Sequence, residues 1–77
     1  MARLKIRLTR HLVARMTQRA IGFDLLRETL RNPDSTEPAR EGRVKAVRRW
    51  SRDTCVVICE RLSASEVRAT TAYLRRG

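Results

Sequence analysis

The only histidine of the chain, His11, begins a short stretch in which arginines follow at helical spacing. Arg15 comes four residues later, and Arg19 four residues after that. In a helix, residues four apart lie one above the other on the same face. An imidazole moves protons near neutral pH, and a guanidinium binds phosphate through paired N–H groups. The spacing therefore indicates acid–base chemistry on a phosphate ester.

Residues 9–20, which hold these side chains, repeat apolar residues at the spacing of an amphipathic helix. Thr9 is a favourable N-cap for this helix. Its buried stripe is expected to consist of Leu12, Val13, Met16 and Ala20. This arrangement turns His11 and Arg15 to the opposite, polar side, with Arg19 at the margin.

Further elements flank this helix. Residues 3–9 alternate apolar and basic side chains, the pattern of a strand with one buried face. Residues 21–33 have the spacing of a second helix, with Gly22 as its N-cap and Pro33 at its end. The buried stripe of the second helix is expected to consist of Phe23, Leu26 and Leu30. The polar connection that follows holds a short extended piece around residues 35–37.

Three strands are expected after this connection, over residues 43–50, 54–62 and 66–74. The middle one is apolar on both faces, which favours a central position in a sheet. The first one alternates, so Arg48 and Trp50 share one face with small apolar residues. The opposite face of that strand carries Lys45, Val47 and Arg49.

The order of elements is strand, helix, helix and then three strands, which indicates an α+β fold. We expect the three C-terminal strands to form an antiparallel meander, with both helices packed on one face of the sheet. The other face is then open and rich in arginine. At 77 residues the chain forms a single domain, residues 1–77.

The chain is strongly basic, since 18 Lys and Arg against 8 Asp and Glu give a net charge of +10. Such a field favours a polyanionic partner, namely RNA, DNA or an acidic protein; the alternative is a solvated surface in an arginine-rich proteome. Cys55 and Cys59 lack a metal-binding spacing and are expected to be buried, reduced thiols, as in a reducing cytoplasm. No leader peptide or membrane span is expected. We therefore expect a cytoplasmic protein that binds no membrane, no metal and no cofactor.

A ribonuclease that works without a metal needs a group that moves protons and cations that stabilise the phosphorane. The candidate catalytic residues are His11, Arg15, Arg48 and Tyr73. The candidate RNA-binding residues are Arg19, Lys45, Arg49, Trp50, Arg68 and Thr71. Each of these residues also has a purely structural interpretation. The helical residues can be solvated surface, the aromatic residues can serve packing, and the threonine can be an ordinary strand residue.

Four short motifs resemble a family of small bacterial toxins. They are H-x3-RM-x2-R-x-I at residues 11–21, L-x3-L-x-NPD at 26–34, VVI at 56–58 and VRATTAYL at 67–74. Together they span nearly the whole chain and are similar to RelE-like and BrnT-like toxins of type II toxin–antitoxin modules. The resemblance implies a compact RelE-like α+β fold, metal-free cleavage of mRNA, either free or on the ribosome, and a cognate antitoxin as partner.

By the pattern of that family, the site residues fall on His11, Arg15, Arg19, Arg48 and Thr71–Tyr73. The chain departs from the family at Arg68, a position that is often apolar, and it lacks the lysine-rich active site of RelE itself. Three functions stay open. The first is a toxin endoribonuclease, and the second is a RelE-fold protein that binds RNA or DNA without cutting it. The third is a protein-interaction module whose basic face binds an acidic protein, and such a module could be encoded by a phage.

Overall fold

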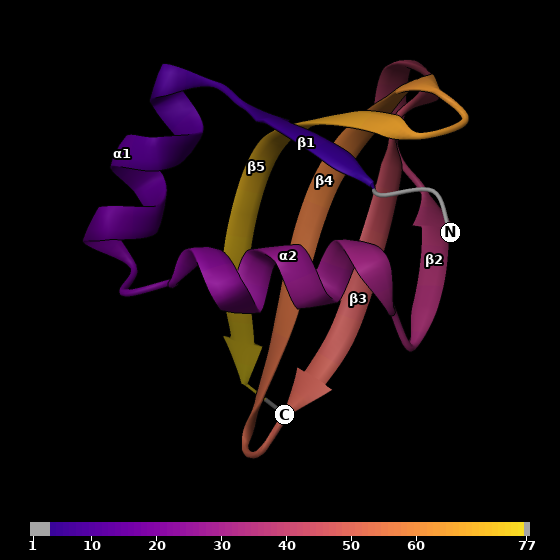
Figure 1. Cartoon of the computed structure of the whole chain (residues 1–77). Coiled ribbons are helices and arrows are strands. Elements are labelled where there is room, and N and C mark those ends of the chain that lie inside the picture. The colour runs from indigo at the N-terminus through magenta and orange to yellow at the C-terminus, as the bar shows by residue number, and fades with distance from the viewer. Residues whose placement is uncertain (1–3, 77) are drawn as a thin grey trace.

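The computed structural model describes residues 4–76, which form two helices, one 3₁₀ turn and five strands (Figure 1). The helices are α1 (Arg10–Gln18) and α2 (Phe23–Arg31), and the 3₁₀ turn is η1 (Arg40–Gly42). The strands are β1 (Lys5–Leu8), β2 (Ser35–Pro38), β3 (Val44–Trp50), β4 (Asp53–Ser63) and β5 (Glu66–Arg76). The α+β class is confirmed, and each expected helix and strand is present.

The strands of the described residues form one mixed sheet in the order β1-β5-β4-β3-β2. β3, β4 and β5 pair antiparallel with one another, as expected. The sheet is nevertheless not a three-stranded meander, because a short strand extends it at each edge. β2, the extended piece expected around residues 35–37, pairs antiparallel with β3, and β1 pairs parallel with β5. The most apolar strand, β4, holds the central position.

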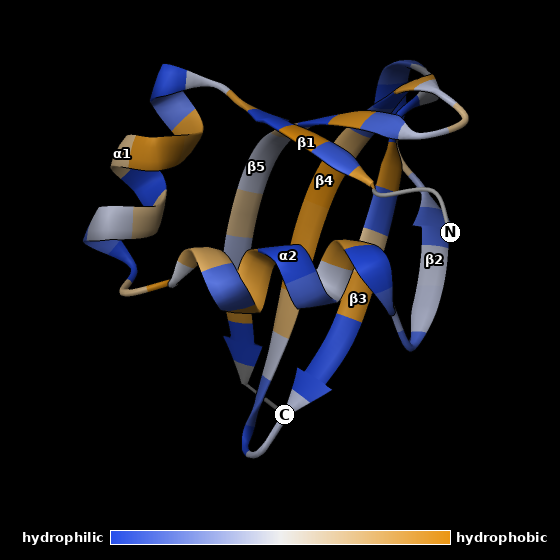
Figure 2. Ribbon diagram, in the orientation of Figure 1, coloured by the Kyte–Doolittle hydropathy of each residue, from blue (hydrophilic) through white to orange (hydrophobic). Residues whose placement is uncertain are grey.

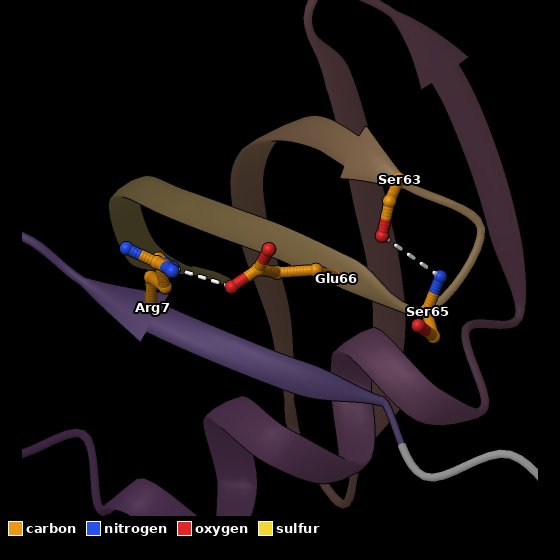
Figure 3. A network of polar contacts seen from close by, with 4 residues as sticks. All are labelled: Arg7, Ser63, Ser65 and Glu66. Atoms are coloured by element: carbon orange, nitrogen blue, oxygen red, sulfur yellow. Dashed lines mark hydrogen bonds and ion pairs between the residues drawn. The ribbon is translucent and has the colours of Figure 1, made fainter.

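Pairing of β1 with β5 brings the first and last strands side by side (Figure 3). Lys5 N donates a hydrogen bond of 2.7 Å to Ser65 O just before β5 begins. The Arg7 guanidinium forms an ion pair with Glu66, and in the preceding turn Ser65 N donates to Ser63 Oγ at 3.3 Å. Parallel pairing with a distant strand leaves no local signal, so the partner of β1 was not predictable from its alternation.

The N-terminal cap of α1 is confirmed, since Thr9 Oγ1 accepts a hydrogen bond of 3.1 Å from Leu12 N. The expected buried stripe is wrong at two positions. Val13 is 47% exposed, because α1 packs mainly against β5 and only a narrow strip of it is covered. Ala20 is exposed beyond the end of the helix, where a φ of +55° breaks the helical phase.

The expected stripe of α2 is wrong at Phe23, which is 43% exposed. Phe23 is the first residue of the helix, and the guanidinium carbon of Arg27 lies 5.6 Å from its ring centroid. Leu26 is fully buried and Leu30 is half-buried, as expected. The predicted N-cap, Gly22, is also confirmed.

The core lies between the helices and one face of the sheet, called here the covered face. In Figure 2, α2 crosses in front of the apolar middle of β4. The fully packed members of this core are Leu12, Met16, Ile21, Leu26, Cys55, Val57, Ala69 and Ala72. Both cysteines are buried and free, as expected.

A bulge in β5 keeps its apolar residues on the covered face. Ile58 of β4 pairs with Thr71, whereas the next residue of β4 pairs with Ala69, so Thr70 is the extra residue. Thr70 Oγ1 donates a hydrogen bond of 3.1 Å to Ile58 O. Because the extra residue shifts the alternation by one, Ala69 before the bulge and Ala72 after it both face the helices.

Candidate functional site

The sheet face turned away from the core is called here the open face. Residues directly opposite each other on paired strands point to the same face, and neighbours along a strand point to opposite faces. Since Val57 faces the core, its neighbours on β4 belong to the open face. Three rows of paired residues cross this face: Glu37–Lys45–Ile58–Thr71, Ser35–Val47–Val56–Tyr73 and Arg49–Thr54–Arg75.

Basic side chains flank the apolar centre of the open face. Lys45 stands in the first row, and Arg49 and Arg75 stand in the third. The middle row holds Tyr73, which is half-buried. Of the predicted RNA-binding residues, Lys45, Arg49 and Thr71 therefore share this face with Tyr73, a predicted catalytic residue.

A hollow of about 590 Å³ opens beside the first row and is called here the basic hollow. Its walls include Arg40, Arg43, Lys45, Ile58, Thr70 and Thr71. Three cations and the Thr71 hydroxyl group around one hollow are the combination that binds an anion by charge and by hydrogen bonds. The Thr70 hydroxyl group already donates to Ile58 O.

Sequence reasoning missed both Arg40, which was assigned to the polar connection, and Arg43, which was assigned to the start of the strand over residues 43–50. They flank a reversal of the chain in which Glu41 has a φ of +61° and Gly42 a φ of +74°. Arg43 N donates a hydrogen bond of 3.2 Å to Arg40 O, which closes this turn. The signal in the sequence was a glycine between two arginines just ahead of a strand, which indicates a tight turn carrying two cations.

Carboxylates moderate the charge at the borders of the open face. Glu37 stands opposite Lys45, and Glu60 Oε2 lies 3.7 Å from Arg68 Nη1. Exposed ion pairs contribute only about 0–1 kcal/mol. Arg68, another predicted RNA-binding residue, can therefore exchange Glu60 for a phosphate at little cost.

The predicted cluster on α1 is formed in part. Arg15 Nε donates a long hydrogen bond of 3.4 Å to His11 Nε2. Arg19 Nη1 donates instead to Ala72 O at 2.9 Å. This bond ties the end of α1 to β5 at the residue before Tyr73.

Arg48 and Trp50 lie on the opposite side of the sheet from Tyr73. Arg48 pairs with the core residue Cys55, and its Nη1 donates to Asn32 O at the end of α2. Its guanidinium carbon lies 5.2 Å from the Trp50 ring centroid. The four predicted catalytic residues therefore do not form one site, because alternation along β3 puts Arg48 on the covered face.

Neither thiol belongs to the candidate site. Burial raises the pKa of the Cys55 thiol, and a hydrogen bond with Thr29 offsets part of this effect. Burial also raises the pKa of Cys59, against the opposing charge of Arg61. Nucleophilic thiols need a lowered pKa, so these two act as small apolar side chains.

Residues 4–76 contain no group of three or more His, Cys, Asp or Glu side chains placed to hold a metal ion. Within the same stretch, no helix combines the length and the apolar character needed to cross a bilayer. Comparison of the chain with models of protein families, with curated proteins and with solved structures finds no match. The RelE-like fold therefore stays a prediction, and function has to be inferred from the residues of this chain.

Proposed function

We propose that the chain binds single-stranded RNA across the open face of its sheet. The observation that carries the proposal is the pairing register, which stands Lys45 and Arg49 on either side of the row that holds Tyr73. These two cations are four residues apart on β3, which is about 13 Å along the strand. A contact zone of that length suits a backbone of several nucleotides better than one small anion.

The chemistry of the open face matches what a single strand offers. Proteins that bind single-stranded nucleic acid combine cations that follow the backbone with aromatic rings on which bases stack. Lys45, Arg49 and Arg75 supply the cations, and Tyr73 supplies the ring. The basic hollow gives a phosphate both charge and hydrogen-bond donors.

The salt dependence of RNA binding tests this proposal. Each phosphate contact on a single strand contributes about 0.7 to the slope of log affinity against log salt, because binding releases counterions. Lys45→Ala and Arg49→Ala should each lower the slope by about 0.7. The measurement is fluorescence anisotropy of a labelled uridine oligonucleotide over a range of salt concentrations.

Arg31→Ala is the matched control, because Arg31 is exposed on α2, away from the open face, and its loss changes the net charge equally. This variant should bind RNA with the wild-type slope. Binding that ignores salt, or a slope that falls equally in all three variants, would exclude the open face as the binding surface.

A second candidate function is metal-free RNA cleavage, as a RelE-like toxin neutralised by a cognate antitoxin. The observation in its favour is the contact between Arg15 Nε and His11 Nε2. An imidazole can move protons near neutral pH, and the adjacent guanidinium can stabilise charge on a phosphorane.

Tyr73 is the third residue assigned to this second candidate function, and it follows Ala72, whose O accepts from Arg19 at the end of α1. Arg48 is left out, because it lies on the covered face and holds Asn32 O. The resemblance to the toxin family supports cleavage, and α1, which carries His11, packs against β5, which carries Tyr73.

His11→Ala separates cleavage from binding. Removal of a general acid or base lowers a rate by about 10²–10⁴-fold, and His11 is exposed, so folding and RNA affinity should stay unchanged. Tyr73→Phe removes the hydroxyl group and keeps the ring. The measurements are new transcript 5′ ends in cells that express the chain, and cleavage by purified protein in a chelator. Unchanged cleavage by both variants would exclude this site and leave RNA binding alone.

A further inference from the structure

The covered face has an uncovered end at which an aromatic ring is exposed. Trp50, the last residue of β3, is 38% exposed and is the only tryptophan of the chain. It lines a hollow of about 480 Å³, called here the Trp50 hollow, together with Asp24, Leu25, Arg27, Glu28 and Arg48. The Asp24 carboxylate is paired with Arg27 at 3.1 Å.

The walls of the Trp50 hollow offer flat stacking surfaces. The Arg48 guanidinium lies over the Trp50 ring at 5.2 Å and is held there by its hydrogen bond to Asn32 O. Leu25 adds an apolar wall from α2. In single-stranded RNA recognition, unstacked bases lie on aromatic rings and on arginine planes. The hollow therefore has the surfaces that a nucleobase needs.

One carboxylate of the hollow is positioned to select the base. Glu28 is half-buried, and its Oε1 accepts a hydrogen bond of 2.9 Å from Asn32 Nδ2. A carboxylate accepts hydrogen bonds from N–H groups on a base edge. Guanine presents two adjacent donors, N1–H and the 2-amino group, which can reach both carboxylate oxygens. Cytosine and adenine present one amino group beside a ring-nitrogen acceptor, and uracil presents one N–H between two carbonyl groups. An oriented carboxylate therefore favours guanine.

Cations connect the Trp50 hollow with the open face. Arg49, next to Trp50 on β3, stands on the open face in the same row as Arg75. Arg52 is exposed in the hairpin turn that joins β3 to β4, two residues after Trp50. An RNA backbone that leaves the open face at this end of the sheet meets these cations and can turn one base into the hollow.

We infer that the Trp50 hollow is a guanine subsite, in which one base stacks on the Arg48 guanidinium that lies over the Trp50 ring, and its N1–H and 2-amino groups donate to the Glu28 carboxylate. The inference rests on the proposed RNA binding and names the base that the chain selects. It also explains why an arginine and a tryptophan occupy a strand face that is otherwise apolar.

Because Trp50 is the only tryptophan, its fluorescence reports directly on the hollow. Guanosine monophosphate should quench it saturably, and inosine monophosphate, which lacks the 2-amino group, should bind about 5- to 100-fold more weakly. Glu28→Gln keeps the oxygen that accepts from Asn32 but loses the charge, and should abolish this preference. Glu41→Gln, at the basic hollow, is the matched control and should retain it. Equal quenching by guanosine, inosine and uridine monophosphates, or none, overturns the subsite.

Oligonucleotides separate this inference from the proposed function. A hexauridine with one guanosine should bind about 5- to 100-fold more tightly than hexauridine itself, and Trp50→Ala should remove the difference while leaving hexauridine binding unchanged. RNA binding without a guanosine preference overturns the subsite alone. Selective quenching by guanosine monophosphate without binding of either oligonucleotide overturns the RNA-binding proposal and leaves a nucleotide site.

Discussion

Two neighbouring residues of β4, Val56 and Val57, show how differently the two faces of the sheet are built. Both are almost fully buried, at 1% and 0% exposure. Val57 is covered by side chains of the helices, within the main core. Val56 lies on the open face in a row with Val47 and Tyr73, where no helix covers it.

The difference teaches that this chain separates stability from binding by sheet face. The covered face is buried under leucines of α1 and α2 and carries most of the apolar burial. On the open face, a small apolar centre is covered by side chains of the same face, and cations surround it. Changes of charge on the open face should therefore alter partners more than folding.

The largest effect expected from this comparison is on the free energy of unfolding of two valine variants. Val57→Ala should cost about 2–3 kcal/mol, because it removes buried methyl groups and leaves a cavity among fixed neighbours. That is a large part of the roughly 4–12 kcal/mol expected for a chain of this size. Val56→Ala should cost about 1 kcal/mol less, because Val47 and Tyr73 can move into the gap. Urea denaturation measures both, and equal costs would mean that the open face is packed as firmly as the covered one.

A smaller effect concerns the two thiols of the covered face. Since burial raises the pKa of Cys55 and Cys59, both thiols keep their protons in the folded chain at a pH where they ionise in the unfolded one. Their contribution to the free energy of unfolding is complete below the pKa of the unfolded state and is lost as pH rises toward the pKa of the folded state. The loss is at most about 1.4 kcal/mol for each thiol and each pH unit.

The double variant Cys55→Ala, Cys59→Ala tests this expectation. Its stability should fall less steeply than that of the wild type above about pH 9, and its RNA binding should be unchanged. Parallel pH curves for the two proteins, obtained by thermal denaturation, would show that the thiols are accessible in the folded chain.

The smallest effect belongs to the edge of the sheet. The hydrogen bond from Arg7, followed by the charges around it, lowers the pKa of Glu66. The resulting stabilisation is present above the ordinary pKa of a glutamate and is lost as pH falls through the lowered one. Arg7→Ala should reduce this acid dependence, and salt should screen it. The measurement is acid unfolding monitored by circular dichroism. If the variant loses stability at low pH as the wild type does, the ion pair does not have this role.

The sequence predicted those parts of the fold that have local signals. The cap at Thr9, the alternation of β3 and the central position of β4 all follow from short-range patterns, and the structure confirms them. The sequence also grouped Arg48 with Trp50 correctly on one strand face.

The parts that were not predicted depend on distant contacts. Residues 54–62 are apolar on both faces, so their pattern does not say which face the helices cover. Arg48 was therefore combined with Tyr73, although the register puts them on opposite sides of the sheet. The basic hollow was missed for the same reason, since Arg40 meets Thr71 only after β3 and β5 have both paired with β4.

The parallel pair of β1 and β5 has a consequence for the order of folding. Ile6 pairs with Val67, so the first of the five described strands to be synthesised pairs with the last of them. Contacts at such sequence separation form late and slow the folding of a small domain, because the loop between them must close first. During synthesis, β1 therefore remains without its partner strand, and α1 without its packing surface, until β5 emerges. A nascent chain held before residue 66 should still lack the edge against which His11 and Arg15 are positioned.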